Sequence, residues 1–442
     1  MQAKGEAAAA AGSFSARAMS AVWLQVGQCG NQIGQAWWQI LSSEHVPHAE
    51  ADRYPFCSPD GKLNAICVDS EPKVVRQLQK QVKRGSFRES NLIVGKRGRG
   101  NNWAYGYHSL HSASEENLLQ RTMESLRKEV ECRDCYCGTV LFHSLSGGTG
   151  AGLGSRLCEA IRDEYSLGHI LAVTVAPHQA GESALQHYNA LLCLSWLQRH
   201  VDGVLLIQND EVLRRAAALL AETAQVSDVQ PQVSLAAMNA YIASCLAGLL
   251  YPLKAFTTGS GISMGLEPWE LLRSVCPVPA MKFLRVAQAR RRGTVFWDSL
   301  ASSVVHSLPR ESHAGQSLHY STSMLAVARS YQEDTFLLSR DSVLRKLKQA
   351  YRCVPWNPFP LRCWTDSLNV VEPGCPSHSL TVCANHSSSA ELLQQVVGRA
   401  QAMYETKAYL HWYWRYGCEE EDFQQAFETL RSVADDYSRL GE

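Results

Sequence analysis

A glycine-rich segment in the first half of the chain, Ser144-Leu-Ser-Gly-Gly-Thr-Gly-Ala-Gly-Leu-Gly154, constrains the fold more than any other feature. The apolar run at residues 138–142 before it is typical of a buried strand, and residues 155–164 after it are typical of a helix. Glycines without side chains let backbone N–H groups approach an anion, and the positive end of the following helix dipole favours negative charge. The segment therefore predicts a phosphate-binding loop between a strand and a helix.

This loop differs from a P-loop because no Gly-Lys-Ser/Thr follows it, so no lysine can reach the terminal phosphates. Taken alone, it is also compatible with a glycine-rich turn that binds no ligand. The other loops of the chain decide between these interpretations.

The length of the chain limits the number of its domains, and its charge and hydropathy exclude some classes of partner. With 442 residues, the chain has room for two or three domains with full cores. Lysine plus arginine and aspartate plus glutamate each number 42, so the net charge is zero and no long-range field favours nucleic acid. No apolar stretch reaches the ~18 residues of a membrane span. The sequence thus predicts no nucleic-acid partner and no membrane insertion.

The 15 cysteines are scattered, and many stand in apolar runs, which is typical of reduced core thiols in an intracellular protein. Cys132, Cys135 and Cys137 are close in sequence, but no fourth ligand stands at the spacing of a zinc site. Residues 1–19 are rich in alanine and lack the apolar core of a secretory signal, so they predict a flexible N-terminal extension.

Strand-like and helix-like runs alternate through the first half of the chain, and each strand-like run precedes a polar turn. This alternation predicts an α/β fold with a doubly wound parallel sheet, a nucleotide domain over residues 20–233. In such sheets ligands bind at the carboxyl ends of the strands. Residues 234–387 predict an α+β intermediate domain, in which the three arginines at 290–292 are expected in a solvated loop. Residues 388–442 predict a C-terminal helical pair, over 390–413 and 419–440.

Several loops, taken together, resemble those of tubulins in the order of that family. They are residues 27–34 (GQCGNQIG), 68–72 (VDSEP), 100–107 (GNNWAYGY) and 146–154 (SGGTGAGLG). Residues 407–413 (KAYLHWY) and 419–423 (EEEDF) resemble the tubulin C-terminal helix pair. The resemblance covers residues 20–442 and is strongest to the delta- and zeta-tubulin branch, with the short middle of the chain favouring zeta.

The resemblance implies that the chain binds GTP or GDP together with Mg²⁺. Glu71, helped by Asp69, would hold the ion, because a hard cation prefers carboxylate oxygens. The phosphates would lie against one set of residues, with Thr149 adding a hydroxyl donor and Asn101 on the γ-phosphate side: Gln28, Cys29, Asn101, Ser144, Gly147, Gly148, Thr149 and Gly150.

On the nucleoside side, Glu182 and Gln186 match positions near the ribose. Asn209 and Asn239 match the two asparagines that read guanine, since an amide offers both a donor and an acceptor. Gln186 stands where many tubulins have a glutamate, and it loses the charge. Leu235 stands where the family stacks an aromatic ring on guanine, which predicts base binding weaker by roughly 1 kcal/mol.

Simpler interpretations of single residues remain open. Asp69 and Glu71 are also compatible with carboxylates at a helix N-terminus, where the dipole favours them. Asn209 is also compatible with a turn, and Glu182 with a solvated surface charge.

In the family, the catalytic carboxylate for GTP hydrolysis comes in trans from the next subunit. Glu270 matches that position and would orient and deprotonate the attacking water; alternatively, Pro268-Trp-Glu270 simply opens a helix. The resemblance implies a weak GTPase of the cytoplasmic cytoskeleton, acting at centrioles or basal bodies of cilia. Its partners would be other tubulins or centriolar proteins in head-to-tail contact. A pseudo-GTPase scaffold and a stand-alone GTPase are the alternatives.

Overall fold

The computed structural model describes residues 21–43, 56–58, 60–82, 86–108, 117–133, 135–181, 183–223, 232–253, 267–294, 296–308, 318–331 and 335–441. The predicted N-terminal extension at residues 1–19 and the predicted site residue Glu182 lie outside these ranges.

Six strands of the first half form the parallel sheet that the sequence predicts, in the order β3-β2-β1-β4-β5-β6. Their residues are almost all apolar and buried, as expected for a parallel sheet that is covered on both faces. The strands are β1 (Ala21–Val26), β2 (Ala65–Asp69), β3 (Leu92–Val94), β4 (Gly138–Ser144), β5 (His169–Ala176) and β6 (Gly203–Gln208).

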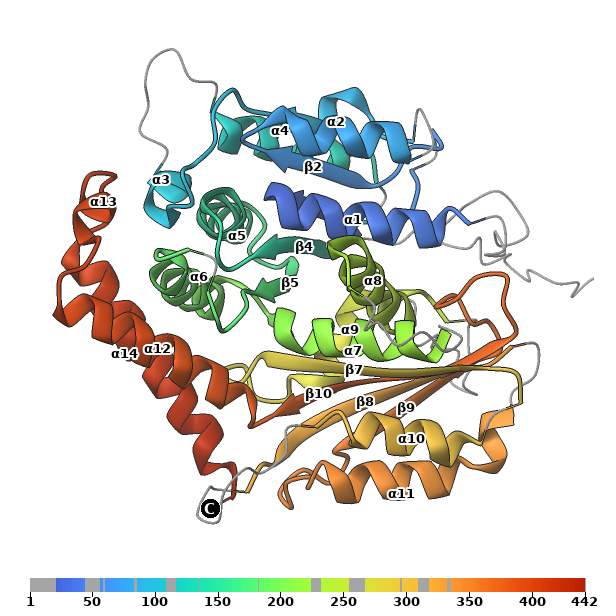
Figure 1. Ribbon diagram of the computed structural model, residues 1–442. Helices are drawn as coiled ribbons and strands as arrows, with labels where there is room; N and C mark the ends of the chain where they lie inside the picture. Colours follow the sequence, from blue (N-terminus) through green and yellow to red (C-terminus); the bar gives the residue numbers. More distant parts are fainter. Residues whose placement is uncertain are drawn as a thin grey trace, which may run out of the picture.

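Two helical layers cover the two faces of this sheet. Neighbouring residues of β1 point to opposite faces and show which helices pack on each. Trp23 packs in the core with α1 (Gly27–Leu41), α2 (Pro72–Gln81), α7 (Asn209–Thr223) and α8 (Leu235–Leu250). Leu24 packs in the opposite core with α3 (Trp103–His108), α4 (Leu118–Glu131), α5 (Gly154–Glu164) and α6 (Gln186–His200). The structure is therefore an α/β sandwich of three layers (Figure 1).

The sheet continues into the second half of the chain, where it becomes mixed. Two residue pairs join β6 in parallel to β7 (Phe283–Arg292). The order then runs through β10 (Ser377–His386) and β8 (Ser321–Arg329) to β9 (Leu361–Asp366). The helices α10 (Trp297–Val305) and α11 (Arg340–Ala350) cover one face of this part, and α9 (Pro268–Val275) leads into it (Figure 1).

The loop predicted at residues 290–292 is wrong, because Arg290, Arg291 and Arg292 are the last residues of β7. They pair antiparallel with Ser379, His378 and Ser377 of β10. The cross-strand partner lies more than 80 residues along the chain, so the local run of charges gave no signal for a strand.

The C-terminal helices lie along one side of the molecule (Figure 1). The predicted helix over 390–413 is interrupted: α12 (Ser389–Glu405) ends before Lys407 and Tyr409, whose φ values of 54° and 59° are left-handed, and the short α13 (Leu410–Trp414) follows. Beyond it, α14 (Glu420–Ser438) begins with a capping box between Glu419 and Asp422, and α12 and α14 pack on α6.

Short helical turns complete the described chain: η1 (Glu89–Asn91), η2 (Gly148–Leu153), η3 (Thr335–Leu338) and η4 (Arg439–Gly441). Among the described helices, none combines the length and the apolar character that crossing a bilayer requires. The domain boundaries at 233/234 and 387/388 remain predictions.

Candidate functional site

A cavity of about 910 Å³ lies at the carboxyl ends of β1, β2, β4, β5 and β6. Cavities of this size hold small-molecule ligands, and this edge of a parallel sheet is where such ligands bind. Asp69 and Glu71 line it, and so do all the predicted nucleotide-contact residues that the structure describes: Gln28, Cys29, Asn101, Ser144, Gly147, Gly148, Thr149, Gly150, Gln186, Asn209 and Asn239.

The helical structure after β4 begins within the glycine-rich segment, at Gly148, whereas the sequence predicted a helix from residue 155. A π-helical turn, η2, begins at Gly148 and runs directly into α5, with Gly147 extended before it. The first N–H groups of a helix have no partner within it, so those of Gly148, Thr149 and Gly150 would be donors for an anion bound in the cavity. The turn is therefore suited to bind an anion.

The glycines of this turn differ in what a side chain would meet at each position. A Cβ on Gly148 would lie 2.6 Å from the carbonyl oxygen of Arg99, and one on Gly150 would lie 2.8 Å from Ser144 Oγ. A Cβ on Gly147 would meet only Ser144 Oγ, at 3.5 Å, which is an ordinary contact. Gly148 and Gly150 thus serve packing, whereas space remains for a side chain at Gly147.

The turn between β1 and α1 is fixed against the same segment. Gly27 has a left-handed φ of 73°, and a Cβ there would lie 2.8 Å from the nitrogen of Gly150. The side-chain amide of Asn31 donates to the carbonyls of Gly27 and Val68, at 2.9 and 3.0 Å. These bonds hold the start of α1, with Gln28 and Cys29, beside the end of β2.

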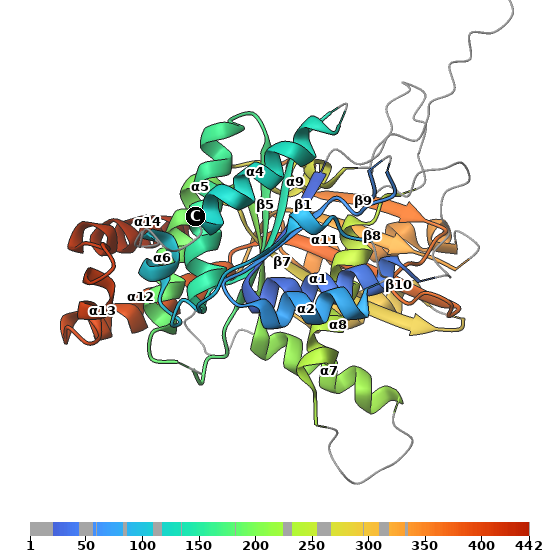
Figure 2. The same cartoon turned by 90° about the horizontal axis from the view of Figure 1, so that it is seen from above.

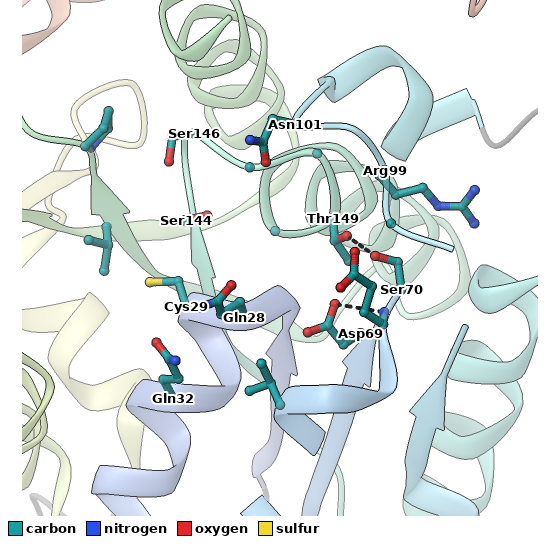
Figure 3. A pocket seen from close by; sticks show the side chains of 18 of the residues that line it. Gln28, Cys29, Gln32, Asp69, Ser70, Arg99, Asn101, Ser144, Ser146 and Thr149 are labelled. Carbon is teal, nitrogen blue, oxygen red and sulfur yellow. Dashed lines mark hydrogen bonds between the residues drawn. The ribbon is translucent and has the colours of Figure 1, made fainter. Parts of the chain in front are cut away.

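Oxygen groups of β2 and η2 gather at one end of the cavity, and Figure 3 shows Asp69, Ser70 and Thr149 there, with Cys29 and Gln32 on the other side. Ser70 Oγ and Thr149 Oγ1 share a hydrogen bond of 2.6 Å. Burial raises the pKa of Asp69 to about 6, against the hydrogen bond from the backbone N–H of Glu71. A nearby cation would favour the ionised carboxylate.

This donor set fits a hard divalent cation such as Mg²⁺, which prefers oxygen ligands. Asp69 and Glu71 would hold it and, when bound, the ion would neutralise phosphate charge. In the described part of the chain, no group of three or more His, Cys, Asp and Glu side chains is placed to hold a metal. Cys135 Sγ and Cys137 Sγ share a hydrogen bond at 3.4 Å and are not joined in a disulfide.

The other end of the cavity carries amides and one aliphatic side chain. Asn209 begins α7, Asn239 is buried on α8, and Leu235, the first residue of α8, is half exposed. His178, after β5, also lines the cavity, and its Nδ1 pairs with Asp210 Oδ1 at 2.8 Å. The side-chain amides of Asn209 and Asn239 would offer both donors and acceptors to the edge of a base bound in the cavity.

The sequence reasoning missed several lining residues, some of which had a signal. Gln32 lies one helical turn after Gln28, on the same face of α1, and His178 and Ser183 follow the carboxyl end of β5. No sequence signal marked Arg99 as a lining residue. Its loop lines the cavity, but its guanidinium points away from the cavity (Figure 3) and lies over the ring of Tyr105, 4.9 Å from the ring centroid.

Glu270 does not line the cavity. It lies on α9, where its neighbour Trp269 stacks on His169, the first residue of β5, with ring centroids 5.5 Å apart. The cavity lies beyond the other end of that eight-residue strand, roughly 25 Å away. Figure 2 shows α9 and α7 toward opposite ends of the strands, although both pack in the same core. Glu270 therefore cannot reach a ligand in the cavity of its own chain.

Comparison with known proteins yields one family model and several full-length relatives. Residues 20–217 match the Tubulin/FtsZ family, GTPase domain. The tubulin delta chain of Homo sapiens is 28% identical over 472 residues, which cover 96% of this chain and 100% of that protein. The nucleomorph tubulin beta chain of Guillardia theta is 26% identical, with 95% of each chain covered. The tubulin beta chain of Aspergillus fumigatus is 27% identical, with 95% of this chain and 94% of that protein covered.

Proposed function

This chain belongs to the tubulin family, and we propose that it is a GTP-binding cytoskeletal subunit of the delta/zeta branch that acts at centrioles or basal bodies of cilia. Similarity to delta chains supports the branch, and zeta remains the favoured member because the middle of the chain is short. The localisation rests on the family resemblance.

One observation carries the nucleotide part of this proposal. Residues predicted separately as phosphate, ribose and base contacts come from several elements far apart in sequence, and they line one cavity of about 910 Å³. A glycine-rich turn without a ligand gives no reason for Asn209 and Asn239 to lie on the same cavity as Gly147 and Thr149.

The residues divide the nucleotide into parts with distinct chemistry. Backbone N–H groups of η2 and the hydroxyl of Thr149 bind phosphate oxygens. Asp69 and Glu71 hold Mg²⁺, which screens the phosphate charge. Gln186, together with Glu182, binds the ribose. Asn209 and Asn239 read guanine and leave adenine with unpaired polar groups, which is the basis of selectivity.

Hydrolysis is completed in trans. Because Glu270 lies at the amino-terminal edge of the sheet and the cavity at the carboxyl edge, subunits that stack head to tail bring one chain's Glu270 over the next chain's cavity. The carboxylate then activates water at the γ-phosphate. Among the described residues that line the cavity, the only carboxylates are Asp69 and Glu71, which this proposal assigns to Mg²⁺, so a stand-alone GTPase would have no further carboxylate there to activate water.

The nucleotide that leaves the purified, denatured protein tests the proposal. We expect GTP or GDP in an amount approaching one per chain, released with Mg²⁺. A protein that carries no nucleotide and binds none when GTP is added is instead a scaffold. Adenine nucleotide in the cavity would contradict the assignment of Asn209 and Asn239.

A further inference from the structure

Asn189, on α6, is fully buried and uses both ends of its amide. Its Nδ2 donates to the carbonyl oxygens of Asn101 and Ser146, at 2.7 and 2.8 Å. Its Oδ1 accepts from the backbone N–H of Trp103 at 2.8 Å and from the hydroxyl of Tyr413 at 2.7 Å. One side chain thus joins three segments that are far apart in sequence.

Two of these segments form the phosphate side of the cavity. Asn101 belongs to the loop 99–102, and Ser146 to the turn that precedes η2; both residues line the cavity, and Asn189 does not. Asn101 has a left-handed φ of 49°, which asparagine adopts more readily than other non-glycine residues, and the hydrogen bond from Asn189 fixes its carbonyl. Asn189 therefore fixes the spacing of the two loops without touching the ligand.

The third segment is the C-terminal one, residues 409–416, which contains α13. Besides the Tyr413 hydroxyl, it contacts the loop 99–102 through the carbonyl of Trp412, which accepts from Asn102 Nδ2 at 3.0 Å. Tyr416 stacks on Tyr105 of α3, with ring centroids 4.5 Å apart and planes 15° from parallel. The phosphate-side loop therefore rests on α13 as well as on Asn189.

We infer that Asn189 is a positioning residue that makes the affinity of the cavity for phosphates depend on the state of residues 409–416. The inference rests on the proposed function, since it takes GTP as the ligand. A shift of α13 removes the Tyr413 hydrogen bond, releases the Asn189 amide and lets the two loops separate. By linkage, GTP in the cavity holds residues 409–416 in place.

Tyr413→Phe tests this coupling, because it removes one hydroxyl and keeps the buried ring. The matched control is Tyr437→Phe on α14: its ring is also fully buried, and its hydroxyl donates to the side-chain oxygen of a buried asparagine, Asn385, at 2.7 Å, away from the cavity. The Tyr413 hydroxyl also donates to Leu185 O at 3.2 Å, close to the ribose side, so the measurement compares ligands with different numbers of phosphates.

Dissociation constants for GTP and GMP are measured for both variants by competition with a fluorescent GTP analogue. We expect Tyr413→Phe to weaken GTP by about three- to tenfold and GMP little, with Tyr437→Phe leaving the GTP to GMP ratio at the wild-type value. Hydrogen exchange at residues 410–416 should slow on addition of GTP in the wild type, and less in Tyr413→Phe.

If the ratio of the GTP and GMP dissociation constants is unchanged in a folded Tyr413→Phe protein, the inference is overturned. It is also overturned if GTP does not change the rate of hydrogen exchange at residues 410–416 of the wild type. A wild-type protein that binds no GTP overturns the proposed function itself. The two failures are therefore distinguishable in one series of measurements.

Discussion

Neighbouring glycines around η2 lie in different surroundings. Gly148 and Gly150 are enclosed by protein atoms, whereas the missing side chain of Gly147 leaves space that belongs to the cavity. A sequence pattern marks all three as backbone that must approach an anion. The structure assigns the close approach at Gly148 to the Arg99–Asn102 loop, a contact that no local pattern indicates.

Gly147→Ala and Gly148→Ala should therefore behave differently. We expect Gly147→Ala to leave the free energy of unfolding within about 0.5 kcal/mol of wild type and to weaken GTP about tenfold, because the methyl group occupies space next to the first N–H of η2. Gly148→Ala should cost about 1–3 kcal/mol of stability, since backbone atoms stand in its way. Thermal unfolding and GTP titration of both variants check this. If Gly147→Ala binds GTP as wild type does, the phosphates do not lie against this turn.

A substitution at Leu235 tests where the base binds. Leu235 is 53% exposed at the cavity rim, next to the predicted base contacts. Leu235→Phe should tighten GTP binding about fivefold, because an aromatic face stacks on guanine and gains ~1 kcal/mol. Leu213→Phe is the control, since Leu213 is 37% exposed on α7 and does not line the cavity. Equal effects of the two changes would place the base elsewhere.

Among the elements, those that follow local periodicity were predictable from sequence. The strand expected at 138–142, the helix expected after the glycine turn and the last helix, expected at 419–440, all match their expected places to within a few residues. The break after α12 was not predictable. Residues 390–413 have helical periodicity throughout. The break is accompanied by contacts of Trp412 and Tyr413 with Asn102 and Asn189, which are far away in sequence.

The strained end of α12 gives a prediction about stability. Lys407 is exposed with a φ of 54°, so Lys407→Gly should raise the free energy of unfolding by about 0.5–1 kcal/mol, because glycine has no Cβ to strain the left-handed conformation. Gln401→Gly, inside α12, should lower it by about 0.5–1 kcal/mol. Chemical denaturation measures both, and a loss of stability in Lys407→Gly would show that this conformation costs little.

For the whole molecule, the separation of Glu270 from the cavity is the feature that matters most. The sequence alone could match Glu270 to a catalytic position by resemblance, but it could not give the distance between α9 and the carboxyl edge of the sheet. That distance follows from the packing of Trp269 against the start of β5. Under the proposed mechanism, a single chain would hold half of a hydrolytic site at each end.

Turnover of GTP should consequently depend on contact between chains. We expect slow hydrolysis at low protein concentration and a specific rate that rises with concentration or with a second tubulin added. Glu270→Gln should abolish the rise and leave GTP binding within about twofold of wild type, because it removes only the base. Glu428→Gln, on the exposed face of α14, is the control. A specific rate independent of concentration would indicate a stand-alone GTPase.

The assignment of the cavity to guanine nucleotides is the central claim, and competition between GTP and ATP for the purified protein tests it most directly. The arrangement of Asn209 and Asn239 predicts that GTP displaces a bound fluorescent GTP analogue at concentrations at least ~100-fold below those that ATP requires, and that Asn209→Ala narrows this gap. Equal displacement by GTP and ATP would contradict the account.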